Sequence, residues 1–375
     1  MLNELQMSRD KLVVWAFIPY KIQDQELISD YDDSTTRQDL EKVFSELEIK
    51  WKWQPITLEN MDAVVEEVAA SRNECLPVVL NYCDGNEIDD YPGISVIKLL
   101  ETKGITFTGA DSNFFDITSS KILMKRTFLE SGVSTAPYEV ISNINDIEGI
   151  CQRFNPPLLV KPSDYYGGAG LSDKSVVHSD DEIRQHLQYL LQEQDCKFTL
   201  GNLFVERFID GREFTVLIVG SAKQPNDLKI YPPLELVFHS SLSNFEKIKC
   251  HHIHQEKSLE GFLTGKLVTC SLSEQICDLA KRAYCAVGGN GYSRVDIRMD
   301  NESQELFVLE VNANCGISYQ PISPVIEDGQ TCVGTILHLA GIPFAQLMSE
   351  IIGEAFFRDY TKFGQFNNNE SNLVS

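Results

Sequence analysis

The stretch SRVDIRMD, residues 293–300, shows the clearest strand pattern in the chain, and LFVLEVNAN, residues 306–314, follows it after a polar turn. Arg294, Asp296 and Arg298 alternate with apolar residues, so a strand here would have one charged face and one buried face. We predict that the two stretches pair as a β-hairpin and that the charged face of the hairpin carries chemistry.

The polar face of this hairpin predicts a magnesium site. In the second strand, Val308, Glu310 and Asn312 share one face, and pairing would bring the two polar residues close to Asp296. Two carboxylates and an amide oxygen are hard oxygen ligands, which suit Mg²⁺ when phosphates and water complete its octahedron. Arg294 beside such a site would stabilise charge on a reacting group. The alternative is a solvated sheet face held by ion pairs.

Length and charge restrict the class of protein. A chain of 375 residues is too long for one ordinary core and predicts two or three domains. The net charge of -23 argues against nucleic acid as a partner, because phosphates require clustered Lys and Arg. No apolar run approaches the roughly eighteen residues of a membrane helix, and the start MLNELQMSRDK lacks the features of a secretory signal. We therefore expect a cytoplasmic protein without a membrane or nucleic-acid partner.

Neither the cysteines nor the histidines form a recognisable disulfide or metal pattern. The 10 cysteines are scattered and make no CxxC pair, so we expect reduced thiols that mostly fill cores. His251, His252 and His254 in HHIH suggest zinc, but no carboxylate or Cys follows at a familiar ligand spacing. We therefore assign no metal role to these histidines.

Strands and helices are expected to alternate along the chain, which predicts α/β or α+β layers. Strands are expected at 11–18, 76–81, 105–108, 158–161, 203–206, 214–219, 293–300 and 305–311. Helices are expected at 92–104, 120–131, 273–287 and 344–357 and after residue 179. The implied units are an N-terminal α/β domain at 1–118, a central domain at 119–207, a C-terminal domain at 208–360 and a polar tail at 361–375.

A lysine and a glycine-rich loop follow one of these apolar strands. Lys161 ends the strand and precedes PSDYYGGAGLS, in which Gly167, Gly168 and Gly170 would let backbone N–H groups approach an anion. The loop is not a P-loop, because GxxxxGK[ST] is absent. Glycine-rich loops are common, so this motif is weak on its own.

Two further stretches are also weak by themselves. VERFIDGREF places Glu206 at a strand end and Glu213 after a tight turn, where each could accept a hydrogen bond from a nucleoside or be an ordinary surface acid. In SSKILMKRTF, charge alone predicts that Lys121, Lys125 and Arg126 form the solvated side of an amphipathic helix.

The order of these motifs resembles that of the ATP-grasp ligases, in particular the D-alanine–D-alanine ligase branch. The resemblance covers about residues 81–357 and rests on GITFTGAD…SK, VKPS, FVERFIDGREFTV, GYSRVDIRMD, LEVNANCGIS and GIPFAQLMSEII. It implies an ATP-grasp fold of three domains, with ATP bound between the central and C-terminal domains. It also implies two Mg²⁺ ions, with Mn²⁺ as an alternative.

The resemblance implies a role for each matching residue. The nucleotide ligands would be Lys121 and Lys161 on the phosphates, Gly167, Gly168 and Gly170 in a closing lid, Glu206 and the Phe208 backbone at the adenine, and Glu213 at the ribose. The metal ligands would be Asp296, Glu310 and Asn312. The catalytic groups would be Arg294 and the Gly316 amide on the tetrahedral intermediate, and Lys249 on the γ-phosphate.

The implied activity is phosphorylation of a carboxylate, or a related oxygen, followed by attack of an amino-acid amine and release of ADP and phosphate. The substrate half of the sequence departs from the family. The first strand leads into IPYKIQDQELISDY without a Gly-rich turn, NYCDGNEI replaces HGxxGEDG, and Tyr165 and Tyr166 occupy lid positions. The serine expected after CGIS falls at Pro321 or a near neighbour.

We therefore expect a ligase with an altered substrate pocket, whose partners are a small-molecule carboxylate or ketone and an amino acid. One alternative is a mycosporine-type ligase that joins an amino acid to a cyclohexenone core, on which Tyr165 and Tyr166 would stack. Others are a true D-alanine–D-alanine ligase, an ATP-grasp phosphotransferase and a non-catalytic nucleotide-binding protein. Family analogy also suggests a homodimer.

Overall fold

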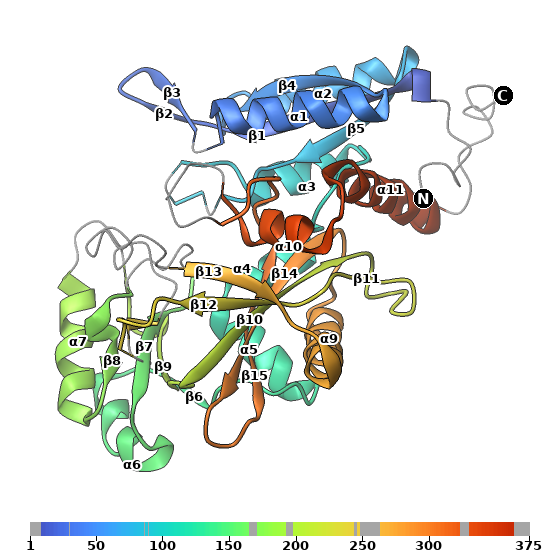
Figure 1. Ribbon diagram of the computed structural model, residues 1–375. Helices are drawn as coiled ribbons and strands as arrows, with labels where there is room; N and C mark the ends of the chain where they lie inside the picture. Colours follow the sequence, from blue (N-terminus) through green and yellow to red (C-terminus); the bar gives the residue numbers. More distant parts are fainter. Residues whose placement is uncertain are drawn as a thin grey trace.

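The computed structural model describes residues 9–29, 31–85, 87–88, 90–164, 171–192, 198–243, 246–247, 263–322 and 330–363. These residues form three units, each built on its own main sheet, of three, six and four strands (Figure 1). Short 3-10 helices lie at Arg9–Lys11, Ser71–Asn73, Ile144–Ile147 and Asp173–Ser175. No single described helix is long and apolar enough to cross a membrane; Cys332–Ala340 and Phe344–Tyr360 meet that test only as a pair bent by 117°.

The first unit is a parallel sheet covered on both faces. Its strands, in spatial order, are β4 (Lys50–Ile56), β1 (Leu12–Pro19) and β5 (Leu76–Asn81). One face packs on α1 (Ser34–Leu47) and α11 (Phe344–Phe363), the other on α2 (Met61–Ala70) and α3 (Ile94–Thr102). Burial on both faces explains why β1 reads as a continuous apolar run. A small hairpin, β2 (Lys21–Gln23) and β3 (Glu26–Ile28), projects from this unit (Figure 1).

The strand predicted at 105–108 is wrong, because the structure has only an isolated bridge between Val79 and Phe107 there. Two backbone hydrogen bonds join Val79 to Thr106 and Thr108, and the chain then turns at Gly109, which has φ +88°. A Cβ at Gly109 would lie 2.2 Å from Asn314 Oδ1, so the turn depends on glycine. The chain therefore leaves the sheet after a single bridge.

The second unit is an antiparallel sheet in the order β13-β12-β10-β14-β15, with β11 also paired to β10. Its strands are β10 (Gly211–Val219), β11 (Lys229–Ile230), β12 (Leu234–Phe238), β13 (Leu263–Leu267), β14 (Tyr292–Asp300) and β15 (Leu306–Ala313). The helices packed against it are α4 (Ser112–Ser119), α5 (Lys121–Glu130), α9 (Cys270–Ala286) and α10 (Cys332–Ala340). In Figure 1 this sheet lies between the other two units.

The third unit is a four-stranded antiparallel sheet with helices on one side (Figure 1). Its strands, in spatial order, are β6 (Tyr138–Val140), β9 (Leu203–Arg207), β7 (Leu158–Pro162) and β8 (Val176–Val177). Its helices are α6 (Ile150–Phe154) and α7 (Asp180–Gln192), and Ile183, Leu187 and Leu190 of α7 join a separate core with the strands. This unit therefore has an apolar core of its own.

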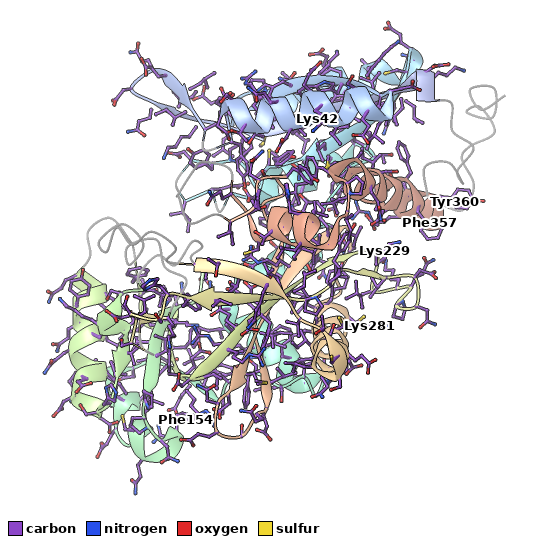
Figure 2. The ribbon with its side chains drawn as sticks, viewed as in Figure 1. Lys42, Phe154, Lys229, Lys281, Phe357 and Tyr360 are labelled. Carbon is purple, nitrogen blue, oxygen red and sulfur yellow. The ribbon has the colours of Figure 1, made fainter. Side chains whose placement is uncertain are left out.

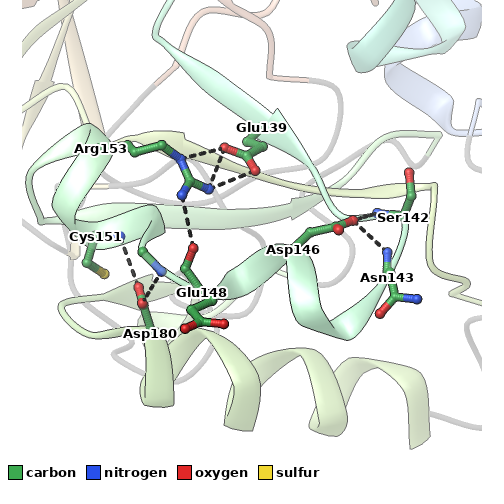
Figure 3. A network of polar contacts seen from close by, with 9 residues as sticks. Glu139, Ser142, Asn143, Asp146, Glu148, Cys151, Arg153 and Asp180 are labelled. Carbon is green, nitrogen blue, oxygen red and sulfur yellow. Dashed lines mark hydrogen bonds and ion pairs between the residues drawn. The ribbon is translucent and has the colours of Figure 1, made fainter.

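A polar network fixes the short helix α6 within the third unit (Figure 3). Arg153 Nη2 lies 2.8 Å from both carboxylate oxygens of Glu139 on β6, and Arg153 Nη1 donates to the Glu148 carbonyl at 2.9 Å. Asp180, the first residue of α7, accepts from the N–H groups of Gly149 and Cys151 at 2.7 and 2.9 Å. The start of α7 therefore caps the start of α6.

The cysteines agree only partly with the sequence analysis. Within the described ranges they form no disulfide, as expected. The expectation that they mostly fill cores is met only in part: of the cysteines in the described ranges, Cys83, Cys315 and Cys332 are buried, four are half-buried and Cys270 is exposed. Cys151 of α6 packs against the edge of the core of the third unit, where a small side chain need not be fully enclosed.

Candidate active site

A hydrogen-bonded junction between α5 and the end of β7 brings Lys121 near Lys161. The Ser163 carbonyl accepts from the Lys121 N–H at 3.1 Å, and the Ser163 hydroxyl accepts from the Ile122 N–H at 3.2 Å. The same hydroxyl lies 2.9 Å from that of Ser120, the N-cap of α5. Because the first N–H groups of a helix lack helical partners, these contacts fix the start of α5 against the strand.

Lys161 belongs to a buried cluster of two lysines and one glutamate. Lys161 Nζ lies 2.5 Å from Glu206 Oε1, and Lys125 Nζ lies 2.6 Å from Glu206 Oε2. The side chains of Lys125 and Glu206 are 2% and 3% exposed, whereas that of Lys161 is 15% exposed. Burial alone would raise the pKa of Glu206, but the two lysines lower it to about 2. Glu206 is therefore an ionised carboxylate.

The interpretation of Lys125 as part of a solvated helix face is wrong. Lys125 is buried and donates to Thr135 Oγ1 at 2.8 Å, whereas Lys42 on α1 and Lys229 on β11 lie on the outside of the molecule (Figure 2). Spacing was the available signal: Lys125 follows Lys121 by four residues, so both lie on one helix face. If Lys121 faces a site, Lys125 is on the same face, one turn further along the helix.

Strands β14 and β15 pair in antiparallel fashion as predicted, with Asp296 opposite Glu310 and Arg294 opposite Asn312. Asn312 Nδ2 donates to Asp296 Oδ2 at 3.0 Å, and Lys121 Nζ lies 3.7 Å from Glu310 Oε2. Directly opposed residues of such a pair have Cβ atoms about 5 Å apart. The structure therefore brings the three predicted metal ligands together and places Lys121 beside them.

A β-bulge corrects one part of the predicted strand pattern. The register shifts beside Ile297, which pairs with Val308 and leaves Leu309 outside the pairing. Val308 is consequently buried in the same core as Val311 and does not share a face with Glu310. An extra residue reverses the alternation along one strand only, so a strict period of two could not predict it.

Asp296 is held from two sides. Arg294 donates to it through Nε and Nη2, both at 2.9 Å, and Thr215 Oγ1 donates to Oδ1 at 2.6 Å. Burial disfavours the charge on Arg294, but Asp296 keeps the pKa of the guanidinium well above its usual value. Thr215 was missed by the sequence analysis, although its spacing from Glu213 in REFTV puts both on one face of β10.

Glu213, the predicted ribose ligand, is paired with the buried Arg298. Arg298 Nε donates to Glu213 Oε2 at 2.9 Å, and Arg298 Nη1 donates to the Ile209 carbonyl at 3.1 Å. The guanidinium carbon lies 5.3 Å from the centre of the Phe208 ring. The Phe208 N–H itself donates to the Pro157 carbonyl at 3.0 Å. Arg298 therefore holds Glu213 and the segment after β9 in one place.

Gly316 lies in a loop that connects the second unit to the first. Asn314 has φ +51°, and its Oδ1 accepts a hydrogen bond from the Ala110 N–H at 2.8 Å. Two residues beyond Ile317, the Tyr319 N–H donates to Asp39 on α1 at 3.2 Å. The loop that carries the predicted Gly316 amide is therefore anchored at both ends.

Several predicted residues lie outside the described ranges: Lys249, Gly167, Gly168, Gly170, Tyr165, Tyr166, His251, His252 and His254. Among the described residues no group of three or more His, Cys, Asp or Glu could hold a metal ion. Asp296 and Glu310 supply two carboxylates, so a third protein ligand would be the amide of Asn312. The Asn312 amide would then have to flip, because only its Oδ1 can bind a cation and its Nδ2 now faces Asp296.

The residues present fit a nucleotide with Mg²⁺. Glu206, at the end of β9, is an ionised carboxylate, which is the kind of acceptor that an adenine amino group needs. Lys121 and Lys161 supply cations for phosphates. The oxygen donors of the hairpin match the preference of Mg²⁺ for few carboxylates plus phosphate and water.

Comparison with known proteins identifies the family of this chain. The family model described as D-ala D-ala ligase C-terminus matches residues 128–353, more than half of the chain. The D-alanine–D-alanine ligase of Geobacter sulfurreducens is 28% identical over 258 residues, which cover 69% of this chain and 72% of that protein. The enzyme of that name from Bordetella petrii is 26% identical over 256 residues, which cover 68% and 70%.

Solved structures show the same fold. The D-alanine–D-alanine ligase of Bacillus anthracis complexed with ATP matches with a TM-score of 0.62 and 17% identity, covering 94% of this chain and 99% of that one. The D-alanine–D-alanine ligase of Coxiella burnetii gives a TM-score of 0.62 at 16% identity, covering 94% and 97%. The α/β layers therefore form an ATP-grasp fold, and the chain belongs to the D-alanine–D-alanine ligase family of ATP-grasp ligases.

Proposed function

We propose that this chain phosphorylates a carboxylate, or a related oxygen, with ATP and joins it to the amine of an amino acid, releasing ADP and phosphate. One observation carries the proposal. The junction at Ser163 holds Lys121 and Lys161 on neighbouring elements, and Lys121 also lies beside Glu310 of the β14–β15 hairpin. Cations and metal-binding carboxylates so arranged stabilise the charge of a transferring phosphoryl group.

In this proposal ATP binds between a central domain at 119–207 and a C-terminal domain at 208–360. The phosphate ligands are Lys121, Lys161, the lid glycines Gly167, Gly168 and Gly170, and Lys249 at the γ-phosphate. The nucleoside ligands are Glu206 and the backbone of Phe208 at the adenine and Glu213 at the ribose. The ion pair of Glu213 with Arg298 supports the last role, because it orients the carboxylate while one of its oxygens remains for a hydroxyl.

Asp296, Glu310 and Asn312 would hold two Mg²⁺ ions, or Mn²⁺. When bound, such ions neutralise charge on the phosphates and on the oxygen under attack. Arg294 is clamped to Asp296 and stays charged, so it would stabilise the tetrahedral intermediate formed when the amine attacks, together with the N–H of Gly316.

The substrate half supports a pocket unlike that of a dipeptide ligase. Tyr31 Oη donates to Asp84 at 2.6 Å, and the rings of Tyr31 and Tyr82 lie 5.7 Å apart. Asp84 and Tyr82 belong to NYCDGNEI, in place of the family pattern HGxxGEDG. The two rings suit a flat small molecule, and the Asp84 carboxylate suits the amine of an amino-acid co-substrate. Coupling of an amino acid to a cyclohexenone core, as in mycosporine-type ligases, is one reaction of this kind.

A second candidate is D-alanine–D-alanine ligation, which the names of the relatives favour. The test is phosphate release from Mg-ATP across a panel of amino acids, each alone and with candidate acceptors, with products identified by mass spectrometry. Release only when an amino acid meets a non-peptide acceptor supports the altered pocket. Release with D-alanine alone, yielding the dipeptide, contradicts it.

The same assay separates the remaining alternatives. A phosphotransferase would form ADP without an amine and retain phosphate on its product. A non-catalytic protein would bind ATP without turnover under any condition. A homodimer, proposed by family analogy alone, is tested separately by light scattering of the full chain.

A further inference from the structure

A third lysine lies beneath the two that face the proposed phosphate site. Lys125 is buried, with its Nζ 2.6 Å from Glu206 Oε2, and it donates to Thr135 Oγ1 at 2.8 Å and to the Ala136 carbonyl at 3.4 Å. The Tyr138 ring centre lies 5.4 Å from Nζ. With 2% of its side chain exposed, Lys125 has almost no surface with which to contact ATP itself.

We propose that Lys125 is a positioning residue: it is the permanent counterion of Glu206 and so allows Lys161 to leave Glu206 for the phosphates when ATP binds. The inference rests on the proposed use of ATP. It adds Lys125 to the proposed ATP site as a residue that acts only through Glu206 and Lys161.

The charges of the cluster lead to this role. Two cations share one carboxylate, and they use different oxygens: Lys161 lies on Oε1 and Lys125 on Oε2. Lys161 is the more exposed of the two lysines, so it can exchange its carboxylate for a phosphate. Glu206 would then still face Lys125. A buried charge that keeps its partner avoids the large cost of a buried unpaired ion.

Without Lys125, the same exchange would be unfavourable. Movement of Lys161 to the phosphates would leave the buried Glu206 without a counterion. Lys161 would instead remain bound to Glu206, and the phosphates would lose a ligand.

The anchoring of Lys125 suits a fixed counterion. Its partner Thr135 donates through Oγ1 to the Val308 carbonyl at 2.9 Å, and the Val308 N–H donates to the Ser134 carbonyl at 2.8 Å. Lys125 is thereby fixed to β15 of the second unit, while Glu206 lies on β9 of the third unit. Lys125 therefore also sets where Glu206 lies relative to the metal-binding hairpin.

The test measures binding of a non-hydrolysable ATP analogue with Mg²⁺ to the full chain by calorimetry. We expect Lys125→Met to weaken binding by about tenfold or more, because an unpaired buried charge is costly. Lys125→Arg, which keeps the charge, should stay within about threefold of the wild type. The matched control is Lys98→Met, which removes a surface lysine paired with Asp116 and should change nothing.

A second variant separates charge from packing. Glu206→Gln removes the carboxylate that needs a counterion, so adding it to Lys125→Met should make binding tighter than in Lys125→Met alone. A packing defect at Lys125 would not be relieved in this way. Thermal unfolding of every variant shows whether it folds; if Lys125→Met does not, Lys125→Gln, which keeps a donor for Thr135, replaces it under the same thresholds.

The outcomes distinguish this inference from the proposed function. If the wild type binds the analogue and Lys161→Ala weakens binding, near-normal binding by Lys125→Met overturns the inference and leaves the proposed function intact. A double variant no tighter than Lys125→Met also overturns it. If the wild type itself binds no nucleotide, the proposed function fails first.

Discussion

At the scale of single residues, Glu310 is the carboxylate on which the site depends most. It lies opposite Asp296, is 30% exposed, and faces Lys121 at 3.7 Å. We expect Glu310→Gln to lower the rate of ATP turnover by about 100-fold or more, because it removes one of two carboxylates available to the metal ions. Phosphate release is the measurement.

The matched control for this change is Glu302→Gln, in the exposed turn that joins the same two strands. It removes the same charge from the same hairpin, and activity should stay within about twofold, as is usual for a surface substitution far from a site. Near-normal turnover in Glu310→Gln would remove the hairpin from the proposed mechanism.

Single residues also show what the sequence could and could not predict. The alternation of Arg294 with Val295 and of Asp296 with Ile297 predicted the two faces of β14, because burial on one face imposes a period of two. The bulge at Leu309 could not be predicted from that period. The burial of Lys125 also escaped prediction, since a charged residue on a helix is exposed unless a tertiary partner exists, and Glu206 lies 81 positions away in the chain.

At the scale of elements, the start of α6 depends on the start of α7. Asp180 accepts from the N–H groups of Gly149 and Cys151, and these bonds lower the pKa of its carboxyl although burial raises it (Figure 3). We expect Asp180→Asn to destabilise the protein by about 1–3 kcal/mol, because the amide can accept through one oxygen only. Asp181→Asn, at a side chain 83% exposed, should cost less than about 1 kcal/mol. Chemical denaturation of both variants tests this, and equal effects would contradict it.

The helix α7 also makes stability depend on pH. Burial, and then the charge of Lys174, lower the pKa of His186 from 6.5 to about 4. Between these values the unfolded chain binds a proton that the folded chain does not. Stability therefore rises with pH across this window and is lost as pH falls through it, by up to about 3 kcal/mol.

The measurement is the difference in Tm between pH 6.5 and pH 4.5. His186→Gln keeps a polar atom near Ser175, which lies 3.1 Å from the histidine ring, but it cannot take up a proton. We expect this variant to lose less Tm than the wild type on acidification. His178→Gln, at an exposed histidine of the same unit, should behave as the wild type. An unchanged pH dependence in His186→Gln would show that His186 does not govern the effect.

At the scale of the whole molecule, alternation of strands and helices predicted layers but not which layers share a core. Alternate residues of β1 belong to two different cores: Val14 packs in one with Ile351 of α11, and Phe17 packs in the other with Ile276 of α9. Both cores join the first and second units, and the core of Val14 also takes in Leu159 and Val176 at the edge of the third unit. Contacts between residues so distant in the chain leave no local pattern, so they could be found only in the structure.

This sharing of cores predicts the order in which the units unfold. The third unit has a core that includes Val160, Ile183 and Val205, and of its strands only Leu159 and Val176 pack in the core that contains Val14. It can therefore lose most of its structure while exposing little of the other two units. The first and second units cannot separate without exposing both shared cores, and they should unfold together. Hydrogen exchange followed by mass spectrometry at rising urea should therefore show α7 and β9 losing protection first, and β1, β14 and α11 losing it together at higher urea. Loss of protection in β1 at a lower urea concentration than in β14 would mean that the shared cores do not couple the two units.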